Sequence, residues 1–387
     1  MIYHDHNATS PLRACARHAI ATALEGCGNA SSIHGPGRAA RACIEKSREQ
    51  VSKLAGCAPS AVIFTSGGSE ANALALRGAV AGALAAEDRI TRIFVTAIEH
   101  DSVRANAAAL AETVPGIKLS EIPVTRDGAI DLGALRLQLI QGKGRVLVSV
   151  MAANNETGVI QHLDAVRRIV SAEGGEGALL HVDAVQSAGR VALSFAALAA
   201  DYMTLSAHKL GGPQGAGALI VKDGAPLAPI ISGGGQEMGR RSGTENVAAI
   251  AGFGETAEEA AGLDDMSRIA RLRATFESEL KQLMPEAKIF GANAPRLPNT
   301  SNFAIPGLSA ETALIALDLD GIAVSSGSAC SSGKVKPSHV LAAMGVDEKL
   351  ARSGLRVSFG WSSCEEDVGA IVASLRTLVR RRAAMAA

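Results

Sequence analysis

Short apolar, β-branched runs alternate with longer helical patterns between residues 60 and 225. The runs predict strands at residues 61–65, 92–97, 118–123, 145–151, 178–183, 202–206 and 217–222. Strands that alternate with helices are typical of βαβ units, so we expect a mostly parallel, seven-stranded sheet. The last two strands are joined by the segment GGPQGA, which is too short for a crossover helix, and they should run antiparallel.

The pattern changes after the glycine-rich segment SGGGQEMGRRSGT. One long helix is predicted at about residues 244–285, and fewer strands follow it, in SNFAI, GIAVS and LRVSFG. These features predict an α/β fold with two domains. Residues 15–255 would form the large domain, and residues 1–14 together with 256–387 a smaller α+β domain.

The composition excludes several classes of function. Basic and acidic residues both number 38, so no overall basic field favours direct nucleic-acid or membrane binding. The N-terminus has no secretory pattern and no apolar run reaches the ~20 residues of a membrane span, so we expect a soluble, cytoplasmic protein. None of the six cysteines has the short spacing of a zinc site, and no resident metal is expected. Cys330 differs from the other five because its glycine- and serine-rich surroundings, SSGSACSSGKV, cannot pack it into a core.

Polar segments follow five of the predicted strands: TSGGSEAN, EHDS, NNETG, DAVQ and SAHK. Ligands of open α/β sheets bind at the carboxyl ends of the strands. We therefore expect these five segments to converge on one polar site.

Gly68 and Ser69 directly precede a predicted helix, where free N–H groups suit one phosphate. Ser69 could equally be an ordinary helix N-cap. The segment GGGQEMGRRSGT adds Arg241, Ser242 and Thr244, which also suit an anion. No Walker lysine and no G-x-G-x-x-G after a strand is present, which argues against a nucleotide.

Asp183 and Lys209 both emerge from apolar strands. A carboxylate at such a position needs a cationic partner, either a protonated pyridine nitrogen or, more commonly, an arginine. A lysine there could extend harmlessly to solvent, or could form a Schiff base if its amine were desolvated. Together, beside a phosphate site, the two residues match the needs of pyridoxal phosphate.

Four further residues have a functional and an ordinary interpretation. His100 could stack on a flat cofactor and move protons, or could be a surface histidine. Asn155 and Gln186 could bind a phenolic oxygen, although both residue types are common in turns. Arg356 alternates with apolar neighbours and could clamp a substrate carboxylate or form an internal ion pair.

The chain resembles the class V, fold-type-I pyridoxal-phosphate enzymes, and among them the cysteine desulfurases of the NifS/IscS type. The resemblance extends from YHDHNATSPL to LRVSFG. Its most specific motifs are HVDAVQS, SAHKLGGPQGAGAL, GGGQEMGRRSGTEN and SSGSACSSGKVKPSHVL. At the phosphate site GGSE replaces the Ala-Thr-Glu often seen, and Ser69 keeps the hydroxyl.

The resemblance implies a role for each matching position. Lys209 would bind the cofactor covalently, Asp183 would pair with the pyridine nitrogen, and Cys330 would accept sulfur. Gln186 would lie at the phenolic oxygen, His100 on the ring, and Asn155 between cofactor and substrate carboxylate. Arg356 would clamp that carboxylate. The phosphate would be held by Gly68, Ser69, Ser206, His208 and, from the second subunit of a homodimer, Thr244.

The implied reaction converts L-cysteine to L-alanine and leaves a persulfide on Cys330, with His100 handling thiol protons. A sulfur-acceptor protein, such as an iron–sulfur scaffold, would be a partner, and Cys330 could contact a cluster transiently. Selenocysteine lyase, aminotransferase or kynureninase-like activity would use the same cofactor residues, but transamination and hydrolysis need no such cysteine. A non-catalytic scaffold would need neither Lys209 nor Asp183.

Overall fold

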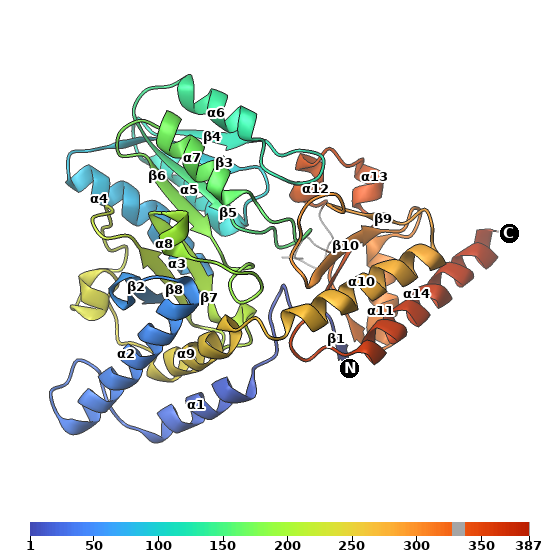
Figure 1. Cartoon of the computed structure of the whole chain (residues 1–387), viewed down its shortest axis with the longest axis horizontal. Coiled ribbons are helices and arrows are strands. Elements are labelled where there is room, and N and C mark those ends of the chain that lie inside the picture. Colours follow the sequence, from blue (N-terminus) through green and yellow to red (C-terminus); the bar gives the residue numbers. More distant parts are fainter. Residues whose placement is uncertain (327–336, 387) are drawn as a thin grey trace.

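The computed structural model describes residues 1–326 and 337–386. Its largest element is a seven-stranded sheet with the strand order β2-β8-β7-β6-β5-β3-β4 (Figure 1). All neighbouring strands are parallel except those beside β8, which runs antiparallel to both β7 and β2. The strands are β2 (Val62–Thr65), β3 (Ile90–Thr96), β4 (Lys118–Ile122), β5 (Arg145–Met151), β6 (Leu179–Asp183), β7 (Tyr202–Ser206) and β8 (Gly217–Val221). The predicted mostly parallel sheet is confirmed, including its antiparallel last pair.

Helices cover both faces of this sheet because successive residues of its strands point to opposite sides. On β2, Val62 and Phe64 pack into one apolar cluster and Ile63 into the other. The first face carries α2 (Gly35–Ala55), α6 (Leu132–Ile140), α7 (Leu163–Glu173), α8 (Phe195–Leu198) and α9 (Val247–Ala261). The second face carries α3 (Gly68–Ala73), α4 (Ala79–Ala85) and α5 (Asp101–Thr113), and a π-helical turn at Leu74–Gly78 joins α3 to α4.

The smaller part of the molecule lies to the right in Figure 1. Its core is separate from the two clusters of the large sheet and includes Phe276, Phe303 and Leu375. Its elements are β1 (Ile2–Tyr3), α10 (Met266–Leu283), β9 (Lys288–Ile289), β10 (Thr300–Ala304), α11 (Ala310–Leu319), β11 (Ile322–Ala323), α12 (His339–Ala343), α13 (Glu348–Ala351), β12 (Gly354–Ser358) and α14 (Glu365–Ala386). Helix α1 (Ala14–Glu25) connects β1 back to the large sheet, where it packs on α9.

The first residues of the chain lie beside residues near its end. Strand β1 pairs in parallel with β11, in the register Ile2 opposite Ile322. The next residues continue into the space between the small part and the sheet, where Asp5 forms a bridge with Ser358. The N-terminal segment therefore reaches the carboxyl ends of the large sheet's strands.

The prediction of one helix over residues 244–285 is wrong, because α9 ends at Ala261 and α10 begins at Met266. Gly262 follows α9, and Leu263 has a φ of 56°, a left-handed conformation that no continuous helix contains. The guanidinium of Arg13 contacts Glu259 on one side of the break and Asp265 on the other. The domain boundary expected near residue 255 falls within α9.

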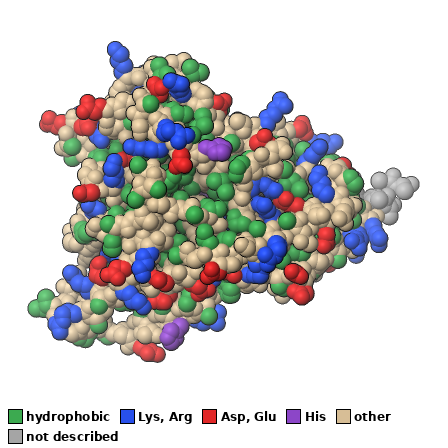
Figure 2. All heavy atoms as spheres, viewed as in Figure 1, with side chains coloured by type: hydrophobic (Ala, Val, Ile, Leu, Met, Phe, Trp, Pro, Cys, Tyr) green, Lys and Arg blue, Asp and Glu red, His purple; other side chains and the backbone are tan. Residues whose placement is uncertain are grey.

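Acidic and basic side chains are intermixed on the face shown in Figure 2, as expected for a chain of zero formal net charge. None of the helices in residues 1–326 and 337–386 is long and apolar enough to cross a bilayer.

Candidate functional site

A cleft of about 790 Å³ lies where the carboxyl ends of the large sheet's strands face the smaller part of the molecule. Polar residues that follow β2, β3, β5, β6 and β7 all line it, as the strand-end argument predicted. The cleft brings together these sequence candidates: Gly68, Ser69, His100, Asn155, Asp183, Gln186, Ser206, His208, Lys209 and Arg356. Thr244 is exposed and is not among the lining residues, and Cys330 lies outside the described residues.

Asp183, the last residue of β6, is 4% exposed and is oriented by neutral donors. Asn72 Nδ2 donates to one carboxylate oxygen at 2.8 Å, and the backbone N–H of Val185 donates to the other at 3.0 Å. The common alternative, a salt bridge to an arginine, does not occur in the described part of the chain. The carboxylate is thus buried and hydrogen-bonded but has its negative charge available for a cationic ligand.

Ser69 does not cap helix α3. The N-cap is Gly67, and Ser69 lies within the first turn without a capping hydrogen bond, so the N-cap interpretation is wrong. A Cβ at Gly68 would lie 2.9 Å from Val185 Cγ2 and 3.3 Å from Ser206 Cβ, so only glycine fits there without displacement. The Ser206 hydroxyl is buried and has no hydrogen-bond partner among the described residues. A buried hydroxyl without a partner is costly, which indicates that a ligand completes this end of the cleft.

Two residues that the sequence suggested for an anion have internal partners. Arg241 forms an ion pair with Glu70 of α3, with Nε 2.8 Å from Oε1. The Ser242 hydroxyl donates to the carbonyl of Gly234. These side chains stabilise the glycine-rich segment against α3 and do not reach into the cleft.

The Lys209 amine is held by the N-terminal segment. Its Nζ donates to the carbonyls of Asn7 at 2.6 Å and Ala8 at 2.8 Å. Burial, followed by the charges of Arg356 and Arg190, lowers the pKa of Lys209 to about 7. The amine is therefore partly neutral at physiological pH, as a nucleophilic lysine requires, and does not extend to solvent.

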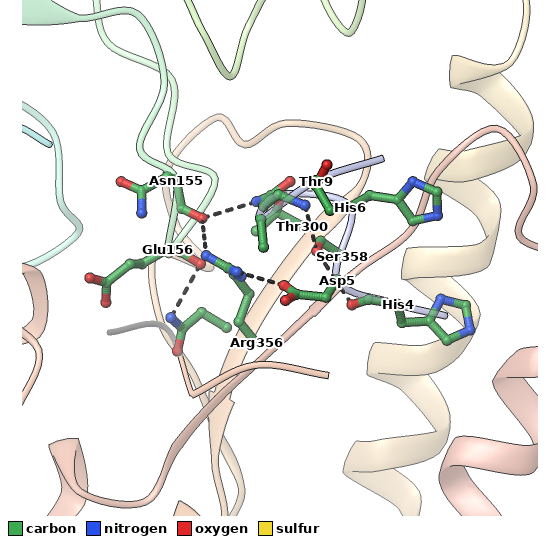
Figure 3. A network of polar contacts seen from close by, with 12 residues as sticks. His4, Asp5, His6, Thr9, Asn155, Glu156, Thr300, Arg356 and Ser358 are labelled. Atoms are coloured by element: carbon green, nitrogen blue, oxygen red, sulfur yellow. Dashed lines mark hydrogen bonds and ion pairs between the residues drawn. The ribbon is translucent and has the colours of Figure 1, made fainter. Parts of the chain in front are cut away.

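Arg356 on β12 is 4% exposed and joins the two parts of the molecule (Figure 3). One Nη donates to the backbone carbonyl of Asn155 at 3.0 Å, and the other forms an ion pair with Asp5 at 2.7 Å. The expected alternative of an internal ion pair is thus present. The Nε atom is buried without a partner among the described groups, so Arg356 retains capacity for a further anion.

His100 lies at the entrance to the cleft and begins helix α5. Its Nδ1 accepts a hydrogen bond from the backbone N–H of Ser102, which leaves Nε2 for a ligand. Beneath it, Glu99 is completely buried, and burial raises the pKa of Glu99 to about 8. The Glu99 carboxyl accepts from Thr96 Oγ1 and the Met151 N–H and so fixes the turn that carries His100.

The residues on either side of the segment that contains Cys330 lie at the cleft. Ser325, before the segment, pairs through its backbone with Arg356, and Ser325 and Pro337 both line the cleft. Beyond the segment, the Ser338 hydroxyl caps α12 and donates to the buried carboxyl of Glu156 at 2.5 Å. Burial raises the pKa of Glu156. The carboxyl can accept this hydrogen bond whether it is protonated or ionised.

Several residues of the site were missed in the sequence. Asp5 and Asn7 lie far from the other candidates along the chain, and only their contacts with Arg356 and Lys209 identify them. Asn72 and Glu99 lie within the polar segments TSGGSEAN and EHDS. Asn72 follows Ser69 by three residues on α3, a spacing that places it on the same side of the helix.

The chain is similar to a known protein family and to several of its members. The sequence profile of the Aminotransferase class-V family matches residues 2–371. The "IscS-like cysteine desulfurase" of Mycobacterium tuberculosis is 40% identical, over 100% of this chain and 99% of that protein. "Cysteine desulfurase IscS" of Dictyoglomus turgidum is 37% identical, over 98% and 95%. The X-ray structure of a NifS-like protein from Rickettsia africae superposes with a TM-score of 0.87 at 36% identity, over 98% of this chain and 99% of that one.

Proposed function

We propose that this chain, which belongs to the class V aminotransferase family and within it to the cysteine desulfurases of the NifS/IscS type, removes sulfur from L-cysteine with the aid of pyridoxal phosphate. The products are L-alanine and a persulfide on Cys330. The observation that carries this proposal is that the segment containing Cys330 begins and ends at the cleft that contains Lys209 and Asp183. Cys330 is five residues from Ser325, and a chain of that length spans at most ~18 Å.

The cleft residues fit pyridoxal phosphate. The unpartnered Ser206 hydroxyl, with Ser69 and the close approach at Gly68, suits the phosphate, and His208 lies beside them. The buried Asp183 carboxylate suits the protonated pyridine nitrogen, and Lys209 suits covalent attachment at the aldehyde. When bound, the cofactor withdraws electrons from the substrate Cα and makes its proton acidic.

Arg356 and Asn155 would orient the substrate carboxylate. The free Nε of Arg356 offers a first donor, and the ion pair with Asp5 holds the guanidinium in place beforehand. A substrate bound here presents its Cα to Lys209. Because the pKa of Lys209 is lowered to about 7, its amine can accept the Cα proton near neutral pH and return it later.

Cys330 would take the sulfur as a nucleophile. Its thiolate attacks the substrate sulfur, so that an S–S bond forms while the Cβ–S bond breaks. The electron pair of the broken bond stays with the substrate carbon skeleton, which leaves as alanine after protonation. His100, at the entrance of the cleft, would accept the proton of the incoming thiol at its Nε2.

The proposal is tested with purified protein, pyridoxal phosphate, L-cysteine and a reductant. We expect alanine and sulfide to form in a 1:1 ratio over many turnovers. Formation of pyruvate and ammonia, or of alanine only when an oxo acid is supplied as amino acceptor, would show a lyase or an aminotransferase instead.

The persulfide needs an acceptor, because the thiolate form of Cys330 must be regenerated for each turnover. We propose that the acceptor is a protein, such as a scaffold for iron–sulfur clusters, and that the enzyme acts in the cytoplasm. The IscS-like name of the mycobacterial relative supports this choice.

We also propose that the enzyme is a homodimer in which Thr244 reaches the cofactor phosphate of the partner subunit. Thr244 is exposed and does not line the cleft of its own chain. Exposed apolar residues occur in two segments of the large domain: Ile231 and Met238 in the segment before Thr244, and Leu24 and Ile33 near the ends of the α1–α2 connection. Figure 2 shows apolar side chains at the tip formed by that connection. Such residues suit burial in a subunit interface.

Mixed dimers separate the two possible arrangements. Thr244→Ala should weaken pyridoxal-phosphate binding about 10- to 100-fold, the loss expected for one hydrogen bond to a charged group. In dimers of one Thr244→Ala chain and one Lys209→Ala chain, the site with intact Lys209 should bind the cofactor with wild-type affinity, because its threonine comes from the other chain. Weak binding at that site would show that Thr244 acts within its own chain.

A further inference from the structure

Arg190 is a buried cation without an acidic partner. It follows β6 by seven residues and is 6% exposed. Its guanidinium donates to the backbone carbonyls of Gln186, His6 and Lys209 at 3.1–3.2 Å, and to the side-chain oxygen of Gln186. No Asp or Glu of residues 1–326 and 337–386 forms an ion pair with it. Since an arginine buried with neutral acceptors alone is costly, its position calls for a functional reason.

The first consequence concerns Gln186, whose side-chain amide could face the cleft in either orientation. Because Arg190 donates to Oε1, that oxygen is already engaged as an acceptor, and Nε2 remains as the donor. Nε2 donates to the carbonyl of Asn7 at 2.9 Å, the same carbonyl that accepts from Lys209. A donor fixed at this point favours an anionic oxygen next to Lys209.

The second consequence concerns the charge near Lys209. Burial contributes most to its lowered pKa, and the cations Arg356 and Arg190 lower it further, whereas Asp5 and Asp183 oppose them. Arg190 contacts the backbone of Lys209 directly, with Nη2 3.2 Å from the carbonyl oxygen. Burial also lowers the pKa of Arg190, to about 9, so Arg190 stays protonated in the range where Lys209 loses its proton. His208 adjoins the pair but its pKa is lowered to about 4 by burial, Lys209 and Arg190, so it is neutral there.

We propose that Arg190 is a positioning residue of the reaction, which turns the Gln186 amide so that it donates to the cofactor's phenolic oxygen and which keeps a positive charge behind Lys209. The proposal rests on the proposed cofactor. Both effects favour a neutral nitrogen on Lys209: the Arg190 charge repels a proton there, and the hydrogen bond from Gln186 disperses the negative charge of the adjacent oxygen, which would otherwise hold the proton on the nitrogen.

The first test is a pH titration of the visible absorbance that pyridoxal phosphate acquires on attachment to Lys209. Arg190→Gln removes the charge and should move the titration midpoint upward by about one pH unit. Arg190→Lys keeps the charge and should move the midpoint less than Arg190→Gln does. Its single nitrogen cannot serve both Gln186 and the carbonyls of His6 and Lys209, so it should weaken pyridoxal-phosphate binding several-fold. An unshifted midpoint in Arg190→Gln, or equal shifts in both variants, would contradict the proposal.

The second test needs no cofactor. The rate at which acetic anhydride labels Lys209 in the apoprotein, followed by peptide mass spectrometry across a pH series, should show a midpoint near 7 in the wild type. We expect a higher midpoint in Arg190→Gln. Arg273→Gln is the control, because Arg273 is also a partly buried arginine that donates to a backbone carbonyl, that of Leu297, and it should leave the Lys209 midpoint unchanged.

The two tests separate the inference from the function on which it rests. If the wild type shows no visible band but the labelling midpoint of Lys209 is higher in Arg190→Gln, the proposed cofactor is wrong and the charge effect of Arg190 is still supported. If Arg190→Gln does not fold, the test uses Arg190→Lys. A wild-type affinity of that variant for pyridoxal phosphate would contradict the proposal that Arg190 positions Gln186.

Discussion

Cys330→Ala is expected to bind pyridoxal phosphate and L-cysteine as the wild type does, yet to form alanine and sulfide at least about 1,000-fold more slowly. Binding is unaffected because the cofactor and carboxylate residues Asp183, Lys209 and Arg356 line the cleft independently of the substituted side chain. The chemical step fails because no other cysteine lines the cleft in the described part of the chain. The measurement is alanine production, with cofactor spectra recorded in parallel.

Cys364→Ala provides the matched control, since Cys364 is an exposed cysteine of the same half of the chain and should be dispensable. In the wild type, cysteine supplied without reductant should add sulfur to the peptide that contains Cys330 and not to the Cys364 peptide. Desulfuration by Cys330→Ala at the wild-type rate would exclude the persulfide mechanism.

Lys209→Ala is expected to abolish covalent attachment of pyridoxal phosphate and to reduce alanine formation by roughly four orders of magnitude or more. Both of its proposed roles, attachment and proton transfer at the substrate Cα, depend on the same amine. No other lysine lines the cleft among the described residues, so none can substitute. The measurement is the visible spectrum, followed by borohydride reduction and mass spectrometry of the protein.

Lys222→Ala serves as the control for this variant. Lys222 follows the last strand of the same sheet but pairs with Asp201 away from the cleft, so its removal should leave attachment intact. A borohydride-stable adduct in Lys209→Ala would contradict the assignment of the lysine.

The parts of the site that could be predicted from the sequence are those set by strand periodicity. Once β6 and β7 are recognised, a parallel arrangement forces Asp183 and the Lys209 turn to the same edge of the sheet. The helix break at residues 262–265 was missed because apolar residues continue on both sides of it, and the left-handed backbone of Leu263 and the contacts of Arg13 show where the chain turns.

The contribution of the N-terminal segment could not be predicted, because it depends on contacts between residues hundreds of positions apart. Nothing in the local pattern around Asp5 or Asn7 indicates that their partners are Arg356 and Lys209. Likewise, Ser69 has a residue type and position suited to an N-cap, and only the backbone at Gly67 shows that the helix starts two residues earlier.

The pairing of β1 with β11 has a consequence for biosynthesis. A ribosome makes the chain from its N-terminus, so Ile2 cannot pair with Ile322, nor Asp5 with Arg356, until nearly the whole chain has been synthesised. A nascent chain that has just released β8 already contains Asp183, Lys209 and the Asn7 carbonyl, the groups suited to the cofactor. The arginine suited to the substrate carboxylate, and the cysteine that would receive sulfur, are both still untranslated. Release of sulfide is therefore expected to begin only when synthesis is almost finished.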